Sequence, residues 1–128
     1  WFDSRAACVL SGVHSEKDLM QKDLRGRYFE NFIFQQMMSW VSTQSIEPEI
    51  FYWKPKAEHA EVDFVLRSSS VVLGIEVKST ESLTFKDTKS MREFLKTHPE
   101  AKQGIIVYTG NKILQVATGI YAVPWFAL

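Results

Sequence analysis

The sequence predicts an α/β fold, because helical and extended patterns follow one another along a single chain. Apolar residues between Gly26 and Val41 recur at spacings of three and four, which predicts an amphipathic helix of about four turns. Residues 61–66 and 71–77 alternate between apolar and polar side chains, as strands do. Residues 105–108 form a continuous apolar run, which is typical of a strand buried on both faces of a sheet.

The remaining segments complete the order α-β-β-β-α-β, with a mixed sheet flanked by helices. Residues 3–13 show a short helical pattern, and the polar residues 15–24 are expected to form a loop or a turn. The run 50–53 predicts the first strand, with its aromatic side chains in the sheet core. Residues 85–97 predict a second amphipathic helix, and residues 114–128 are expected to hold one or two short strands.

Length and composition predict a single domain over residues 1–128. The 128 residues, 45% of them hydrophobic, suffice for one core, and residues 1–20 are expected to be a linking helix and loop. The start at Trp1 rather than Met indicates the C-terminal part of a longer chain. The single cysteine, Cys8, excludes an internal disulfide, so a reduced, cytoplasmic setting is expected.

The charge balance excludes a strongly basic nucleic-acid binder. Fifteen basic and fifteen acidic residues give a net charge of zero, so any affinity for nucleic acid must come from a local patch. No apolar run approaches the roughly 18 to 20 residues that span a bilayer, so no membrane partner is expected.

Charged residues gather on two neighbouring strands. Side chains alternate along a strand, so Glu76 and Lys78 point to the same side of the sheet. On the preceding strand, Val62 and the alternate apolar residues after it form one face, which leaves Asp63 on the other. If Ser69-Ser70 is a two-residue hairpin turn, Asp63 falls directly opposite Glu76, with the two Cβ atoms ~5 Å apart.

This arrangement predicts a site for a divalent metal ion. Two carboxylates directly opposite each other repel unless a cation or a proton lies between them. Mg²⁺ or Mn²⁺ would accept their oxygens, and such ions serve phosphodiester hydrolysis by activating a water and offsetting transition-state charge. Lys78 is then placed to orient that water or to stabilise that charge. For Glu76 and Lys78 taken alone, a solvated strand face explains the pattern equally well.

Asp63 followed by Glu76-Val77-Lys78 resembles the D…ExK signature of the PD-(D/E)xK nuclease superfamily. Val62 stands where many members have a proline. The resemblance implies a restriction-endonuclease-like sandwich, with Asp63 and Glu76 as metal ligands and Lys78 as a catalytic residue. It also implies a further carboxylate from the preceding helix, for which Glu30 is the candidate as both ligand and catalytic residue. A glutamate near a helix N-terminus is also favoured by the helix dipole alone.

A second resemblance covers nearly the whole chain and points to the uncharacterised C-terminal domain of bacterial and archaeal AAA-type ATPases. The matching segments are 2–4, 26–32, 51–54, 61–65, 75–78 and 123–125. This resemblance implies an ATPase domain upstream in cis. The chain itself lacks a phosphate-binding loop, because Gly104 and Gly110 are followed by Asn111 where a lysine is required, so no ATP site is expected within it.

Other polar residues are weaker candidates. Four are considered for contact with nucleic acid: Lys54, Lys56, Ser79 and Lys89. Scattered lysines are most often solvated surface, and a serine at a strand end most often caps the backbone. The three histidines lie in separate segments without the spacing of zinc ligands.

The predicted function is therefore a metal-dependent phosphodiesterase that acts on nucleic acid and is attached to an upstream ATPase. The alternative is a non-catalytic module that binds nucleic acid or protein and regulates that ATPase. The residues of the D…ExK signature favour the enzyme, and the neutral net charge favours the alternative. The sequence leaves a homo-oligomer open.

Overall fold

The computed structural model describes residues 15–21, 24–56 and 59–128, so the helical pattern over residues 3–13 lies outside the described residues. In chain order the elements are α2 (Glu16–Gln21), α3 (Arg25–Val41), β1 (Glu49–Trp53), β2 (Val62–Arg67), β3 (Val72–Lys78), η1 (Phe85–Thr88), α4 (Lys89–Thr97), β4 (Gln103–Tyr108), β5 (Leu114–Ala117), β6 (Ile120–Pro124) and η2 (Trp125–Ala127). None of the helices in these ranges is both long and apolar enough to cross a bilayer.

The strands form one six-stranded mixed sheet in the order β1-β2-β3-β4-β6-β5. β1, β2 and β3 are antiparallel neighbours, β3, β4 and β6 run parallel, and β5 pairs antiparallel with β6. The carboxyl ends of β3, β4 and β6 therefore meet at one edge of the sheet, where α/β proteins commonly bind ligands. The structure confirms the α/β class, and the elements from α3 to β4 follow the predicted order.

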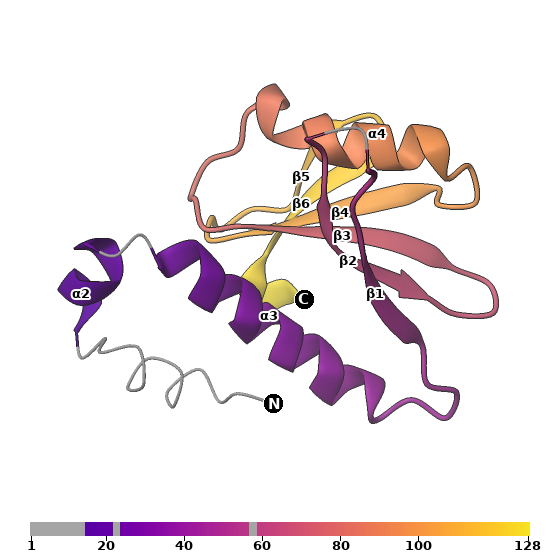
Figure 1. Ribbon diagram of the computed structural model, residues 1–128, viewed down its shortest axis with the longest axis horizontal. Coiled ribbons are helices and arrows are strands. Elements are labelled where there is room, and N and C mark those ends of the chain that lie inside the picture. Colours follow the sequence, from indigo (N-terminus) through magenta and orange to yellow (C-terminus); the bar gives the residue numbers. More distant parts are fainter. Residues whose placement is uncertain (1–14, 22–23, 57–58) are drawn as a thin grey trace.

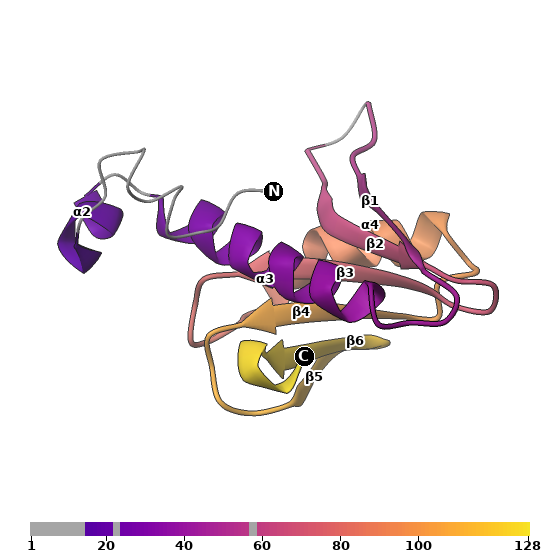
Figure 2. The same ribbon diagram turned by 90° about the horizontal axis from the view of Figure 1, so that it is seen from below.

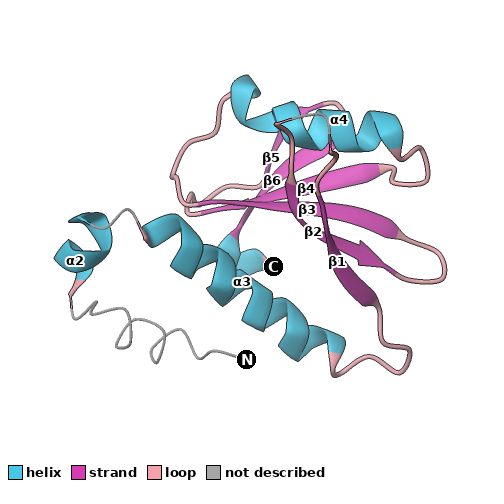
Figure 3. Ribbon diagram, viewed as in Figure 1, coloured by secondary structure: helices cyan, strands magenta, loops and turns pink. Residues whose placement is uncertain are grey.

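Helices cover both faces of the sheet, as Figures 1 and 3 show. α3 packs on one face, where Ile33 and Met37 share a buried cluster with Ile75 of β3. α4 packs on the other face, where Met91 and Phe94 share a second cluster with strand residues. In the view of Figure 2, α3 lies in front of the sheet and α4 behind it. Each central strand therefore packs against α3 with one face and against α4 with the other.

The hairpin of β2 and β3 has the predicted register. A backbone hydrogen bond of 2.9 Å between the residues that flank the two-serine turn closes the hairpin, and Phe64 pairs with Ile75. Beyond that pair, Oδ2 of Asp63 accepts the backbone N–H of Val77 at 2.7 Å, so Asp63 lies beside the Glu76–Val77 segment of β3. Because Ile75 packs on the α3 side, its neighbour Glu76 faces α4.

A β-bulge in β2 corrects one predicted side-chain direction. Between β1 and β2 the pairing shifts, so that two residues of β2, Asp63 and Phe64, face a single residue of β1. The extra residue interrupts the alternation of side chains. Val62, which was expected on the face of Phe64, instead packs with Val65 in the α4-side cluster. Bulges often re-aim a side chain next to a functional site, and here Asp63 lies within one.

Residues 16–21 form helix α2 instead of the predicted loop. The hydroxyl of Ser15 accepts the backbone N–H of Asp18 at 3.2 Å and donates to the Asp18 carboxylate at 2.9 Å. A serine followed three residues later by an acidic residue caps a helix N-terminus in this way. Glu16 and Asp18 also favour the first turn through the helix dipole.

The aromatic residues of β1 are less buried than predicted, because β1 lies at an edge of the sheet. Phe51 is 39% exposed and Tyr52 is 74% exposed. Only Trp53 packs against the α4-side cluster. An edge strand has a neighbour on one side only, which leaves side chains near that edge open to solvent.

Candidate functional site

Asp63 is held by the backbone of the neighbouring strand. Its Oδ2 accepts a hydrogen bond of 2.7 Å from the N–H of Val77, beyond the last Cα pair between β2 and β3. Burial raises the pKa of Asp63, and the nearby Glu61 adds to this, while the Val77 hydrogen bond and the charge of Lys78 oppose it. Asp63 is thus a half-buried carboxylate with a fixed orientation, and its negative charge is disfavoured unless a cation is near.

Glu76 is the most buried charged residue of the site. Its side chain comes from β3, the residue is 4% exposed, and its Oε1 lies 2.7 Å from Nζ of Lys78. Its Oε2 is buried and has no hydrogen-bond partner among the described residues. Burial raises the pKa of Glu76 despite the hydrogen bond and charge of Lys78, and the charges of Asp63 and Asp87 raise it further. A buried carboxylate oxygen without a partner is costly.

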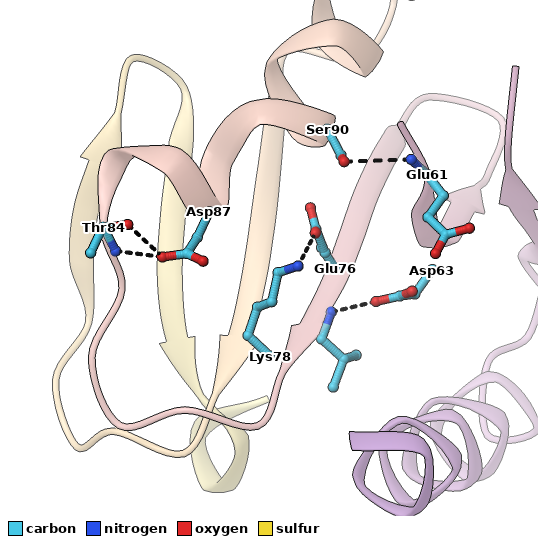
Figure 4. A network of polar contacts seen from close by, with 8 residues as sticks. Glu61, Asp63, Glu76, Lys78, Thr84, Asp87 and Ser90 are labelled. Atoms are coloured by element: carbon cyan, nitrogen blue, oxygen red, sulfur yellow. Dashed lines mark hydrogen bonds and ion pairs between the residues drawn. The ribbon is translucent and has the colours of Figure 1, made fainter. Parts of the chain in front are cut away.

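Lys78 supplies the positive charge of the site. Desolvation disfavours its ammonium, but the hydrogen bond with Glu76 and the charges of the surrounding carboxylates outweigh this and raise the pKa of Lys78. Figure 4 shows its side chain reaching between Glu76 on one side and Asp87 on the other, with Asp63 beyond Glu76. Lys78 therefore stays protonated at neutral pH.

Asp87 is a rigid carboxylate at the start of the crossover to α4. Its Oδ2 accepts hydrogen bonds from the backbone N–H of Thr84 at 2.7 Å and from the Thr84 hydroxyl at 2.8 Å. These hydrogen bonds lower the pKa of Asp87, so the carboxylate stays ionised. Asp87 thus places a fixed negative charge beside Lys78 (Figure 4).

Glu30 and Glu61 add negative charge around Asp63. Glu30 lies in α3 and is half-buried; burial raises its pKa, with the charges of Asp63 and Glu61 acting in the same direction and Arg27 opposing them. Glu61 is exposed, and its carboxylate pairs with Nζ of Lys54 at 2.8 Å. Glu30 therefore approaches Asp63 from the predicted helix, but it approaches on the α3 side of the sheet.

The structure brings together part of the predicted set. Asp63, Glu76 and Lys78 converge, as Figure 4 shows. The charges that act on Glu76 come from Lys78, Asp63 and Asp87, whereas Glu30 is coupled to Asp63 and Glu61. Within the ranges that the structure describes, no three His, Cys, Asp or Glu side chains are grouped closely enough to hold a metal ion by themselves.

The four residues considered for nucleic-acid contact do not form one patch of free charge. Lys54 is neutralised by its ion pair with Glu61. Lys56 is exposed in the loop after β1, and Lys89 is exposed at the start of α4. Ser79 follows β3, and its hydroxyl is buried without a hydrogen-bond partner among the described residues.

A groove with a volume of about 540 Å³ lies away from these carboxylates. It opens between the C-terminal half of α3 and the sheet, and its apolar walls include Trp40, Leu66, Leu73, Ile105 and Leu128. Glu76 and Lys78 face the opposite, α4 side of the sheet. The carboxylate site is therefore separate from this groove.

Two site residues were missed at the level of the sequence, although each carries a signal. Glu61 stands two residues before Asp63, where strand alternation would place both on one face. Asp87 stands three residues after Thr84, which is the spacing of a capping box, and the structure contains that box. Neither signal reveals that the residue contributes charge to the site, because that depends on how η1 and β2 pack.

The comparison with curated proteins found no match. A family model matches residues 25–128, which run from α3 to the end of the chain and include Glu30, Asp63, Glu76 and Lys78. The family is described as a domain of unknown function (DUF4143), which names neither a reaction nor a ligand. Because the match spans most of the 128 residues, the chain belongs to the DUF4143 family of domains of unknown function.

Proposed function

We propose that this domain is a metal-dependent phosphodiesterase that acts on nucleic acid. The observation that carries the proposal is the buried Oε2 of Glu76, which has no partner among the described residues and belongs to a carboxyl group near enough to Asp63 for the Asp63 charge to act on it. Burial raises the pKa of both carboxyl groups despite the nearby charge of Lys78. A divalent ion between them would satisfy the free oxygen and relieve the repulsion.

The residues suit an open Mg²⁺ or Mn²⁺ site better than a site in which protein side chains supply every ligand. Mg²⁺ is usually held by one or two carboxylates, while water and substrate phosphate fill its other positions. Asp63 and Glu76 supply such a pair. Glu30, coupled to Asp63 from α3, is proposed as a supporting carboxylate that acts through Asp63.

Each residue then has a distinct task. A bound divalent ion supplies Lewis-acid charge at the phosphate and makes its bound water more acidic. Val77 fixes the orientation of Asp63 through the 2.7 Å hydrogen bond to its carboxylate. Lys78, protonated and on the same face as Glu76, would orient the attacking water and offset negative charge that develops on the phosphate. Charge held in place before the reaction is the main contribution that such a site makes.

The fold assignment belongs to the same proposal. The order α3-β1-β2-β3-α4-β4, with the acidic residues on the β2–β3 hairpin, supports a restriction-endonuclease-like sandwich of the PD-(D/E)xK superfamily. We further propose that the domain works in cis with an upstream AAA-type ATPase, on the resemblance of its sequence segments. In this proposal the ATPase would regulate the carboxylate site of the domain.

One observation favours a second candidate function, a non-catalytic module that binds a protein partner. β1 is an edge strand, and Tyr52 on it is 74% exposed. Exposed strand edges recruit extended peptides by adding a strand to the sheet. In that reading the carboxylate site is vestigial, and β1 would link the domain to its partner or regulate the ATPase.

Cleavage of nucleic acid separates the two functions. The 128-residue protein is incubated with single-stranded DNA, double-stranded DNA and RNA in the presence of Mn²⁺, beside Glu76→Ala. Glu81→Ala serves as a matched control, because Glu81 is exposed in the loop after β3. We expect cleavage by wild type and Glu81→Ala, and loss of cleavage in Glu76→Ala and in chelator. Absence of cleavage in all three proteins, with no binding of nucleic acid, would favour the module that binds a protein partner.

A further inference from the structure

We propose that Lys78 balances the charge of Glu76 in the metal-free site, and that Asp87 is the positioning residue that pairs with the Lys78 ammonium when a divalent ion binds Glu76. This inference rests on the proposed function, because it assigns the regulation of the same site. It treats Lys78 and the metal ion as competitors for one carboxylate. The site would then exist in two arrangements that exchange by movement of a single side chain.

The first observation is the ion pair between Lys78 and Glu76. Nζ of Lys78 lies 2.7 Å from Oε1 of Glu76, and the Glu76 side chain is 5% exposed, so few other cations reach that oxygen. The opposite oxygen, Oε2, has no partner among the described residues. Lys78 therefore neutralises one oxygen of a buried carboxylate whose other oxygen has no partner, and a divalent ion at Oε2 would bring two positive centres onto one group.

The second observation is the place of Asp87. Two hydrogen bonds from Thr84, of 2.7 and 2.8 Å, both end on Oδ2 of Asp87 and hold its carboxylate in place. Figure 4 shows Asp87 on the side of Lys78 that faces away from Glu76. The negative charge of Asp87 acts on both Glu76 and Lys78. Asp87 is thus a second, preorganised anion that the flexible Lys78 stem meets by turning away from Glu76.

This competition predicts a direction of change in metal affinity that a lysine with only a structural or only a catalytic role would not produce. Removal of the Lys78 charge should strengthen metal binding, because the competing cation is gone. Removal of the Asp87 charge should weaken metal binding, but only while Lys78 is present, because Asp87 acts by drawing Lys78 off Glu76. If Asp87 acted merely as one more negative charge near the metal ion, its removal would weaken binding with or without Lys78.

Affinity for Mn²⁺ alone, measured by calorimetry on the 128-residue protein without nucleic acid, tests these signs. The variants are Lys78→Gln, Asp87→Asn and the double variant, with Glu76→Gln to show that the ion measured binds at this site. Asn at position 87 keeps an oxygen that accepts the Thr84 hydrogen bonds. Lys78→Met replaces Lys78→Gln if thermal melting shows that the glutamine variant is unfolded.

Two controls match the charge changes at a distance from Glu76. Lys86→Gln removes a positive charge from an exposed residue in η1, and Glu81→Gln removes a negative charge from the loop before it. Neither control is expected to change the Mn²⁺ affinity by more than about twofold, because exposed charges are well screened by solvent and salt.

We expect Lys78→Gln to bind Mn²⁺ at least about fivefold more tightly than wild type, and Asp87→Asn about fivefold more weakly, the lower end of usual coupling between sites. The double variant should match Lys78→Gln. Equal affinity of wild type and Lys78→Gln, or an Asp87→Asn effect that persists without Lys78, would overturn this inference alone. If wild type and Glu76→Gln bind Mn²⁺ equally, or neither binds it, the proposed function itself fails.

Discussion

Replacement of Asp63 by asparagine should affect the metal-free and the metal-bound protein in opposite directions. The pKa of Asp63 is raised in the folded protein, because burial outweighs the Val77 hydrogen bond and the charge of Lys78. The fold therefore favours the uncharged side chain over the carboxylate. Asparagine is uncharged and keeps an oxygen for the N–H of Val77. In chelator at neutral pH, Asp63→Asn should melt no lower than wild type.

Saturating metal should reverse that order. An ion that binds only the folded protein stabilises it by RT ln(1 + [L]/Kd), which is about 2.7 kcal/mol at a hundredfold excess over Kd. For a domain of this size roughly 4 °C of melting temperature corresponds to 1 kcal/mol, so wild type should gain about 10 °C. Asp63→Asn should gain much less, because it keeps only Glu76 of the pair.

Scanning calorimetry or far-UV circular dichroism melts of both proteins, in chelator and in Mn²⁺, measure the four midpoints. Glu81→Gln is the matched control, since it removes a negative charge that is exposed to solvent. It should respond to Mn²⁺ as wild type does. An equal rise in wild type and Asp63→Asn would mean that Asp63 is an ordinary carboxylate and would refute the reasoning.

Four further outcomes are expected. In chelator, the advantage of Asp63→Asn should vanish as pH falls towards about 4: a carboxyl with a raised folded pKa contributes most below its unfolded pKa, near 3.9, and loses that contribution as pH rises through the folded pKa. Melts at several pH values check this. Gly74→Ala should lower the free energy of unfolding by about 1–3 kcal/mol in urea titrations, because its Cβ would lie 2.8 Å from Met91 Sδ and 2.9 Å from Phe94; Gly26→Ala, with open space around it in helix α3, should instead stabilise by about 0.5–1 kcal/mol. Nucleic-acid affinity should fall steeply with salt, because contact is mostly to phosphate; binding that ignores ionic strength would indicate a protein partner.

The hairpin and the carboxylate pair were predictable because their pattern is local. The two serines between alternating strands fix the turn, and the turn fixes the register that pairs Phe64 with Ile75 and so brings Asp63 near Glu76. The amphipathic pattern of α3 is equally direct, with Ile33 and Met37 buried on the stripe that faces the sheet.

Other features depend on packing between distant segments. The face of Val62 was wrong because the bulge in β2 arises only when β2 pairs with β1. The exposure of Tyr52 follows from the edge position of β1, which the strand order decides and the local pattern does not. Helix α2, by contrast, had a local signal in Ser15 and Asp18, and the polar composition of the segment concealed it.

The position of Asp87 beside Lys78 was the feature least predictable from the sequence. Its capping box with Thr84 is readable in the sequence, but its position beside Lys78 depends on how the crossover from β3 to α4 turns back over the sheet. Glu30 is the converse case. The resemblance to nucleases implied one converging set, whereas the structure couples Glu30 to Asp63 and Glu61 from the α3 side.

The most direct test of the central claim is anomalous diffraction from crystals grown with Mn²⁺. We expect a peak between Asp63 and Glu76, at about 2.0–2.2 Å from at least one oxygen of each carboxylate, close to the distances that Mg²⁺ adopts. The peak should disappear in Glu76→Gln crystals grown in the same way. Well-ordered wild-type crystals with no peak at these two residues, at a Mn²⁺ concentration that supports nucleic-acid cleavage, would contradict the claim that they hold the metal ion.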